Sequence, residues 1–162
     1  MVDAIVINSG PLITFARMDA FHIFRQLPFR FVTPKEVHDE LLSGPRDVLA
    51  TSFPSMVEIK NLAAPHNSEL FANLDSGEAA VIQLALENGI SNVSLDERKA
   101  RRVAIQNGLT PIGTLGLLGR AKTLGFIGEI NPFIVKALES GVYYDTNLVR
   151  GFLERFDEEW PP

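Results

Sequence analysis

A short segment near the middle of the chain combines the residue types that chemistry on a phosphodiester requires. Residues 92–95 predict a buried strand, Asp96 follows the strand directly, and four basic side chains lie within positions 98–102. In an open α/β sheet, the carboxyl ends of the strands border the crevice in which ligands bind. A carboxylate there suits a hard cation such as Mg²⁺ or Mn²⁺, and arginines beside it suit a phosphate. The segment therefore indicates metal-assisted chemistry on a phosphate ester.

Three further oxygen-bearing side chains are candidates for the same site. Asn8 directly follows a predicted strand over Asp3–Ile7, Glu78 lies in the first turn of a predicted helix, and Glu40 lies in a helix that Pro34 opens. If the strands that precede Asn8 and Asp96 are neighbours, their ends lie about 5 Å apart. That spacing would allow both side chains to contact one cation.

Each of these four residues also has an ordinary structural interpretation. An acid in a first helical turn, as at Glu78, is stabilised by the helix dipole, and Asp96 is suited to cap the helix that it precedes. Glu40 fits a solvated helix face, and Asn8 fits a turn. Spacing alone therefore does not establish a metal site.

The elements that would position these residues alternate between strands and helices. β-branched or alternating runs predict strands over residues 3–7, 29–32, 56–60, 92–95 and 109–112. Apolar periodicity and end signals predict helices over residues 12–16, 21–26, 34–42, 75–88, 96–107, 114–123, 132–139 and 145–156, with a further short helix over 46–50. This alternation predicts an α/β fold, a three-layer α/β/α sandwich with a central, mostly parallel sheet, in one domain over residues 1–162.

Composition narrows the classes of function. The chain has 162 residues, of which 46% are hydrophobic and 22% are charged, and none is cysteine, which excludes disulfides and thiolate metal sites. The net charge of −5 weighs against broad nucleic-acid binding but permits a local basic patch. No apolar run approaches the roughly 18 residues of a membrane helix, and no signal peptide is expected. We therefore expect a cytoplasmic protein that does not associate with membranes.

The basic side chains after Asp96 allow two interpretations. Arg98 and Arg101 share a helix face, which is either solvated or contacts the phosphates of a substrate; an acidic segment of a protein partner could also use it. Thr114 is expected to cap its helix, and its hydroxyl could also face the acidic site. The early Phe residues are expected in the core, whereas Tyr143, Tyr144 and Trp160 are candidates for a subunit interface.

Five segments of the chain carry a resemblance to a known family. They are residues 5–13 (IVINSGPLI), 33–41 (TPKEVHDEL), 74–82 (LDSGEAAVI), 95–101 (LDERKAR) and 113–118 (GTLGLL). In this order they resemble PIN-domain proteins, specifically the toxin-like (VapC-like) branch of bacteria and archaea. The resemblance implies an α/β/α sandwich and a ribonuclease that depends on Mg²⁺ or Mn²⁺.

The same resemblance assigns candidate site residues. Glu40, Glu78 and Asp96 match the acidic positions of the family, whose first strand usually ends in Asp, whereas this chain has Asn8. Asn supplies a neutral oxygen, so the affinity for a divalent ion is expected to fall. A metal at this site would lower the pKa of a bound water and orient it for in-line attack on the phosphodiester.

Three functions from different classes follow. The leading hypothesis is an endoribonuclease, the toxin of a toxin–antitoxin pair, with RNA as substrate, a small antitoxin protein as partner and a homodimer implied by the family. The alternative is an RNA- or protein-binding module in which Asn8 has weakened catalysis. A metal-dependent phosphatase or small-nucleotide hydrolase ranks last, because the chain has no recognisable phosphate-binding loop.

Overall fold

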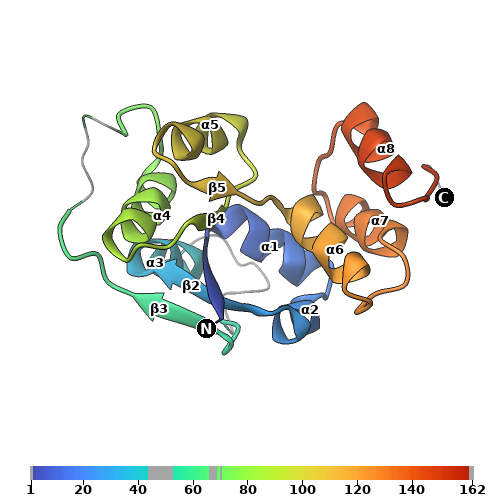
Figure 1. Cartoon of the computed structure of the whole chain (residues 1–162), viewed down its shortest axis with the longest axis horizontal. Coiled ribbons are helices and arrows are strands. Elements are labelled where there is room, and N and C mark those ends of the chain that lie inside the picture. The colour runs from blue at the N-terminus through green and yellow to red at the C-terminus, as the bar shows by residue number, and fades with distance from the viewer. Residues whose placement is uncertain (1, 44–52, 66–68, 70, 161–162) are drawn as a thin grey trace.

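A five-stranded parallel sheet forms the centre of the protein (Figure 1). The computed structural model describes residues 2–43, 53–65, 69 and 71–160. The strands are β1 (Asp3–Ile7), β2 (Phe29–Pro34), β3 (Val57–Lys60), β4 (Asn92–Ser94) and β5 (Thr110–Pro111), in the order β3-β2-β1-β4-β5. Every neighbouring pair is parallel. The α/β class predicted from the alternation of elements is therefore confirmed.

The two strands that precede Asn8 and Asp96 are neighbours, as the site hypothesis requires. β1 pairs with β4 with Ile7 opposite Ser94, and the backbone N–H of Asn8 continues this pairing by donating to Ser94 O at 3.1 Å. On the other side of β1, the Thr33 hydroxyl donates to Ile7 O at 2.8 Å. The end of β1 is thus held from both sides, which fixes the position of Asn8.

Eight helices surround the sheet in the described part of the chain. They are α1 (Ser9–Arg17), α2 (Phe21–Gln26), α3 (Lys35–Ser43), α4 (Ser76–Glu87), α5 (Arg98–Gln106), α6 (Thr114–Thr123), α7 (Asn131–Glu139) and α8 (Thr146–Glu154). α4 packs on β1, β2 and β4, whereas α1 contacts α3, α6 and α7. Figure 1 shows α6, α7 and α8 gathered at the side of the molecule away from β3. None of these helices has the length and apolar character needed to cross a membrane.

The aromatic residues near the N-terminus lie in the core, as predicted. Phe15, Phe24 and Phe31 are buried, and the rings of Phe24 and Phe31 stack with their centroids 4.3 Å apart. Phe21 and Phe29 are partly buried against the same cluster. These rings fill the space that α1 and α2 enclose with the sheet, so base stacking is not their role.

Some predicted helix starts and helix caps differ from the structure, and the differences have physical causes. The helix predicted over residues 114–123 has the predicted bounds, but its cap differs. The helix after β4 starts at Arg98 with Glu97 at the N-cap, so Asp96 is not the cap. Thr114 is the first residue of α6 rather than its cap, which is Gly113. In both cases the polar side chain is used elsewhere, because Asp96 and Thr114 hydrogen-bond to each other. Pro34 ends β2 instead of opening α3. The predicted helix over 46–50 lies outside the described residues.

Candidate active site

Asn8 carries a buried oxygen without a hydrogen-bond partner. The residue is 7% exposed at the carboxyl end of β1, and its side chain does not cap α1. Its side-chain Oδ1 accepts no hydrogen bond in the described part of the chain. Buried carbonyl oxygens are normally paired, because an unpaired one forfeits its hydration. A cation is one ligand that would satisfy this oxygen.

Glu40 reaches the same place from α3. A Cβ atom at position 77 would lie 2.9 Å from Glu40 Oε2, 3.4 Å from Asn8 Oδ1 and 3.5 Å from Asp75 Oδ1. Three side-chain oxygens therefore gather around the backbone of Gly77 in the first turn of α4. Any larger residue at this position would displace them, so the glycine keeps the oxygens close together.

Glu78 is buried in the first turn of α4 and forms a capping box with Asp75. The Glu78 backbone N–H donates to Asp75 Oδ1 at 2.8 Å, and the Asp75 N–H donates to Glu78 Oε1 at 3.1 Å. The helix-end role considered for Glu78 is thus confirmed. It does not exclude a second role, because the other carboxylate oxygen, Oε2, takes no part in these two bonds.

The acids at the start of α4 are held in an environment that disfavours their charge. Glu40 is exposed as a whole residue, as its solvated-face interpretation predicts. Partial desolvation of its carboxyl, followed by the charge of Asp75, nevertheless raises its pKa. Burial is also the main cause that raises the pKa of Glu78, and the charges of Asp75 and Glu97 add to it. The hydrogen bond that the Asp75 backbone N–H donates to the Glu78 carboxylate acts in the opposite direction. A bound cation would relieve both the repulsion and part of the burial cost.

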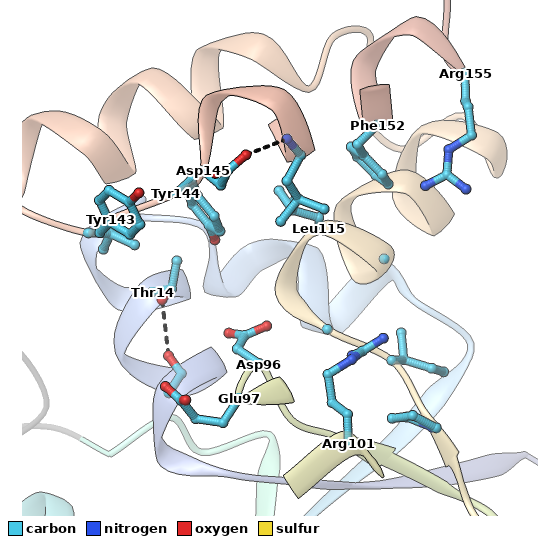
Figure 2. Close-up of a pocket in the computed structure, with 17 residues that line it drawn as sticks. Thr14, Asp96, Glu97, Arg101, Leu115, Tyr143, Tyr144, Asp145, Phe152 and Arg155 are labelled. Atoms are coloured by element: carbon cyan, nitrogen blue, oxygen red, sulfur yellow. Dashed lines mark hydrogen bonds between the residues drawn. The ribbon is translucent and has the colours of Figure 1, made fainter. Parts of the chain in front are cut away.

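Asp96 is fixed by α6. Thr114 donates to both carboxylate oxygens, from its backbone N–H to Oδ1 at 2.8 Å and from its hydroxyl to Oδ2 at 2.6 Å. A Cβ atom at Gly113 would lie 2.9 Å from Asp96 Oδ1, and one at Gly10 would lie 3.9 Å from Asp96 Oδ2. Asp96 therefore sits between the first turns of α1 and α6, and Figure 2 shows its carboxylate at the base of a pocket.

The contacts at three glycines place three of the four candidate ligands. Asn8 and Glu40 meet at Gly77, whereas Asp96 lies near Gly10 and Gly113. Within the described residues, no three acidic or histidine side chains are placed to hold one metal ion. The sharing of one cation by all four candidate residues stays a prediction. The donor set nevertheless fits a hard divalent ion, because it consists of oxygens and includes an unpaired buried one.

The structure separates the two arginines proposed to contact phosphate. Arg101 is half-buried, donates from an Nη to Leu95 O at 2.9 Å and lines the pocket beside Asp96. Arg98 is exposed in the first turn of α5 and does not line this pocket. Arg101 is therefore the better-placed candidate, and contact of either residue with a phosphate stays a prediction.

Two residues of the site were missed in the sequence analysis. The charge of Asp75 acts on Glu40 and Glu78, and the pattern Asp-x-x-Glu before an apolar run is the capping-box signal that identifies it. Tyr144 lies near Asp96 in the pocket: burial, then the negative charge of Asp96, raises the pKa of its phenol, against a lowering by a hydrogen bond with Thr114. No local pattern links Tyr144 to Asp96.

The fold and this site define a class of protein, an α/β protein with side-chain oxygens gathered at the carboxyl end of a parallel sheet. A family model described as PIN domain (DUF3368) matches residues 4–158, so the chain belongs to the PIN-domain family. PIN domains are a family of nucleases, which typically use divalent metals. Neither the curated proteins nor the solved structures contain a significant match to this chain.

Proposed function

We propose that this protein is a metal-dependent endoribonuclease that hydrolyses RNA phosphodiesters. The observation that carries the proposal is the buried, unpaired Oδ1 of Asn8 beside the Glu40 carboxylate, at the carboxyl end of the sheet. Family membership supports a nuclease. The raised pKa values of Glu40 and Glu78 support a cation as the missing ligand, because among the described residues no cationic side chain contributes to the pKa shift of either acid.

Some residues of the site would bind the cation, and others would bind the substrate. Asn8, Glu40, Glu78 and Asp96 would hold Mg²⁺ or Mn²⁺, which supplies an activated water and neutralises phosphate charge. Thr114 keeps Asp96 in one orientation through its two hydrogen bonds. Of the two arginines, Arg101 is tethered to Leu95 O and would donate its remaining N–H groups to a phosphate oxygen.

The biological role belongs to the same proposal and rests on the resemblance to the toxin-like branch of the family. In that role the protein is the cytoplasmic toxin of a toxin–antitoxin pair, with a small antitoxin protein as partner, and it forms a homodimer. Tyr143 is 85% exposed, and this exposure does not distinguish a subunit interface from another binding role. Trp160, at the other end of the C-terminal segment, is only partly exposed.

One observation favours the alternative of a binding module. Asn8 supplies no charge where the family usually has an acid, so the ion affinity falls and catalysis weakens with it. In this case the domain would still bind RNA through its basic residues but would not cleave it.

A cleavage assay on single-stranded RNA distinguishes the two functions. With Mn²⁺ we expect the wild type to cleave, and Asp96→Asn to lower the rate at least about 100-fold, because the lost charge no longer supports a cation or the developing phosphate charge. Glu129→Gln removes an exposed acid from the loop between α6 and α7 and serves as the matched control. Equal rates for Asp96→Asn and the control would contradict the nuclease proposal, and binding without cleavage would favour the module.

A further inference from the structure

A pocket of about 620 Å³ opens beside Asp96, between α6 and α8. Its wall includes the segment that joins α7 to α8, and the residues that matter for its chemistry are Asp96, Arg101, Tyr143, Tyr144, Leu148 and Arg155. Small-molecule sites occupy roughly 300–1,000 Å³. The pocket is therefore large enough for one nucleoside, and the proposed hydrolysis uses only Asp96 and Arg101 of its lining.

One side of the pocket presents apolar and aromatic groups to solvent. Tyr143 is 85% exposed and Leu148 is 57% exposed, although both side chains line the pocket. Tyr144, next in the chain, is largely buried with its phenol close to Asp96. An exposed phenol ring above a concave surface is a stacking platform, because every base has a π-face that it can cover.

The other side carries two cations. Figure 2 shows Arg101 and Arg155 across the pocket from Tyr143 and Tyr144, with Asp96 between the two sides. Neither arginine forms an ion pair within the part of the chain that the structure describes; Arg155 lies over the Phe152 ring at 5.2 Å, and Arg101 donates to Leu95 O. Their charges remain available to an anionic ligand.

The acidic side chains of the pocket favour entry of the base of a nucleotide over entry of its phosphate. Asp96, Glu97 and Asp145 line the same cavity, so it holds three carboxylates against two guanidinium groups. A phosphate among them would meet repulsion except where a cation at Asp96 neutralises it, whereas a neutral base would not. The phosphates would remain on the side of Arg101 and Arg155.

We propose that this pocket binds one unpaired base of a single-stranded RNA, next to the phosphodiester that lies at Asp96. The base stacks on Tyr143, and Arg155 contacts the backbone phosphate that follows it. Single-stranded RNA is recognised in this way elsewhere, through unstacked bases held on aromatic and Arg planes. The inference rests on the proposed ribonuclease function, since it names the part of the substrate that the site selects.

The test measures the affinity for a labelled single-stranded RNA oligonucleotide by fluorescence anisotropy. EDTA is present so that hydrolysis does not compete with binding. Tyr143→Ala is expected to weaken binding about 5-fold to 100-fold, the range for loss of one base stack. Tyr143→Phe keeps the ring and should bind within about 2-fold of the wild type on the same grounds. Arg155→Gln should weaken binding and lower its salt dependence, whereas Arg150→Gln, an exposed arginine of the same helix outside the pocket, should do neither.

A second oligonucleotide series identifies the contact with the base itself. An abasic nucleotide at the bound position should weaken wild-type binding, and should have little further effect on Tyr143→Ala, because the two changes remove the same interaction. Additive losses at every position, or wild-type affinity for Tyr143→Ala, would overturn the proposal. If none of the pocket substitutions changes RNA binding, the proposal is also overturned. A peptide segment of a protein partner would then be the better candidate ligand for the pocket.

The outcomes separate this inference from the proposed function. Cleavage of RNA by the wild type, with KM unchanged in Tyr143→Ala, would leave the ribonuclease standing and refute the base pocket. Binding that depends on Tyr143, without any cleavage in Mn²⁺, would support the base pocket and refute the ribonuclease.

Discussion

Asn8 balances two requirements at the end of β1. Glu40, Glu78 and Asp75 already crowd the start of α4, and the pKa values of Glu40 and Glu78 are raised by burial and then by neighbouring acids. A carboxylate at position 8 would add another like charge to this group. The amide therefore favours stability of the cation-free protein and disfavours cation affinity, a common compromise at functional sites.

The charge at position 78 gives the first prediction at the residue scale. Glu78→Gln keeps an oxygen for the Asp75 N–H of the capping box and removes a buried charge. Because the folded pKa of Glu78 is raised above its ordinary value of 4.5, the contribution of Glu78 to stability is largest below that value and is lost as the pH rises through the raised pKa. Relative to the wild type, the variant should therefore gain stability between pH 4 and pH 7, measured by urea unfolding.

Glu87, at the C-terminal end of α4, is the control, because its pKa is shifted in the opposite direction. Its pKa is lowered, first by the hydrogen bond from the Ala63 N–H, so its contribution to stability is present above pH 4.5 and is lost in acid. Glu87→Gln should therefore lose stability relative to the wild type as the pH rises. The same pH response in both variants would contradict the electrostatic account of the acids around Gly77.

Some site residues were predictable from local patterns and others were not. Asn8 and Asp96 follow strands, and the pairing of β1 with β4 brings these strand ends together as expected. The hydrogen bonds from Thr114 to Asp96 join residues 18 positions apart, and they depend on how α6 packs beside β4. No spacing rule relates two such residues, so the cap roles predicted for both were wrong.

At the scale of elements, replacing either of two glycines on facing helices by alanine should change the stability of the protein in opposite directions. Gly119 of α6 lies against α8, where a Cβ atom would be 2.7 Å from Phe156 Cζ and 3.0 Å from Phe152 Cζ. Gly151 of α8 has no atom within 4 Å of the same position. Gly151→Ala should stabilise the protein by about 0.5–1 kcal/mol through helix propensity, whereas Gly119→Ala should destabilise it by about 1–3 kcal/mol through overpacking.

Thermal unfolding of the two variants beside the wild type provides the measurement. A stabilising Gly119→Ala would mean that α6 and α8 are not in close contact. That result would also remove one wall of the proposed base pocket, because Phe152 lines it.

Element types were more predictable than element ends. The buried runs at β1 and β4 and the broad apolar face of α4 mark these elements in the sequence. β5 is shorter than predicted, Thr110–Pro111 instead of residues 109–112. The Ile112 N–H still donates to Val93 O at 2.8 Å, so backbone bonding to β4 reaches one residue past the end of β5.

At the scale of the whole molecule, hydrogen bonds to Glu158 connect the C-terminal segment to α6 and to the start of α7. Its buried carboxylate accepts hydrogen bonds from Lys122 Nζ at 2.8 Å, from Ile130 N at 2.8 Å and from Asn131 N at 2.9 Å. Burial acts to raise the pKa of Glu158, but these donors together lower it. The sequence alone does not predict this role, because composition does not distinguish buried Glu158 from exposed Glu159.

Glu158→Ala should therefore destabilise the protein by about 3 kcal/mol at pH 7, the lower end of the range for a broken buried pair, since Lys122 is partly exposed. The folded pKa of Glu158 is lowered from 4.5, so its contribution is present above that pH and is lost as the pH falls through the lowered value. Urea unfolding at pH 7 and pH 3 should show the difference between variant and wild type shrinking in acid. Glu159→Ala is the control, and an equal loss in both variants would refute this role of Glu158.

Titration of Mn²⁺ into the purified protein by calorimetry tests the central claim most directly, because it asks whether position 8 belongs to an ion site. We predict weak binding by the wild type and binding at least about tenfold tighter by Asn8→Asp, since a charged ligand replaces a neutral one. Asn147→Asp, which makes the same exchange on the exposed surface of α8, should leave the affinity unchanged. Equal Mn²⁺ affinity in the wild type and Asn8→Asp, or no binding by either, would contradict the metal site.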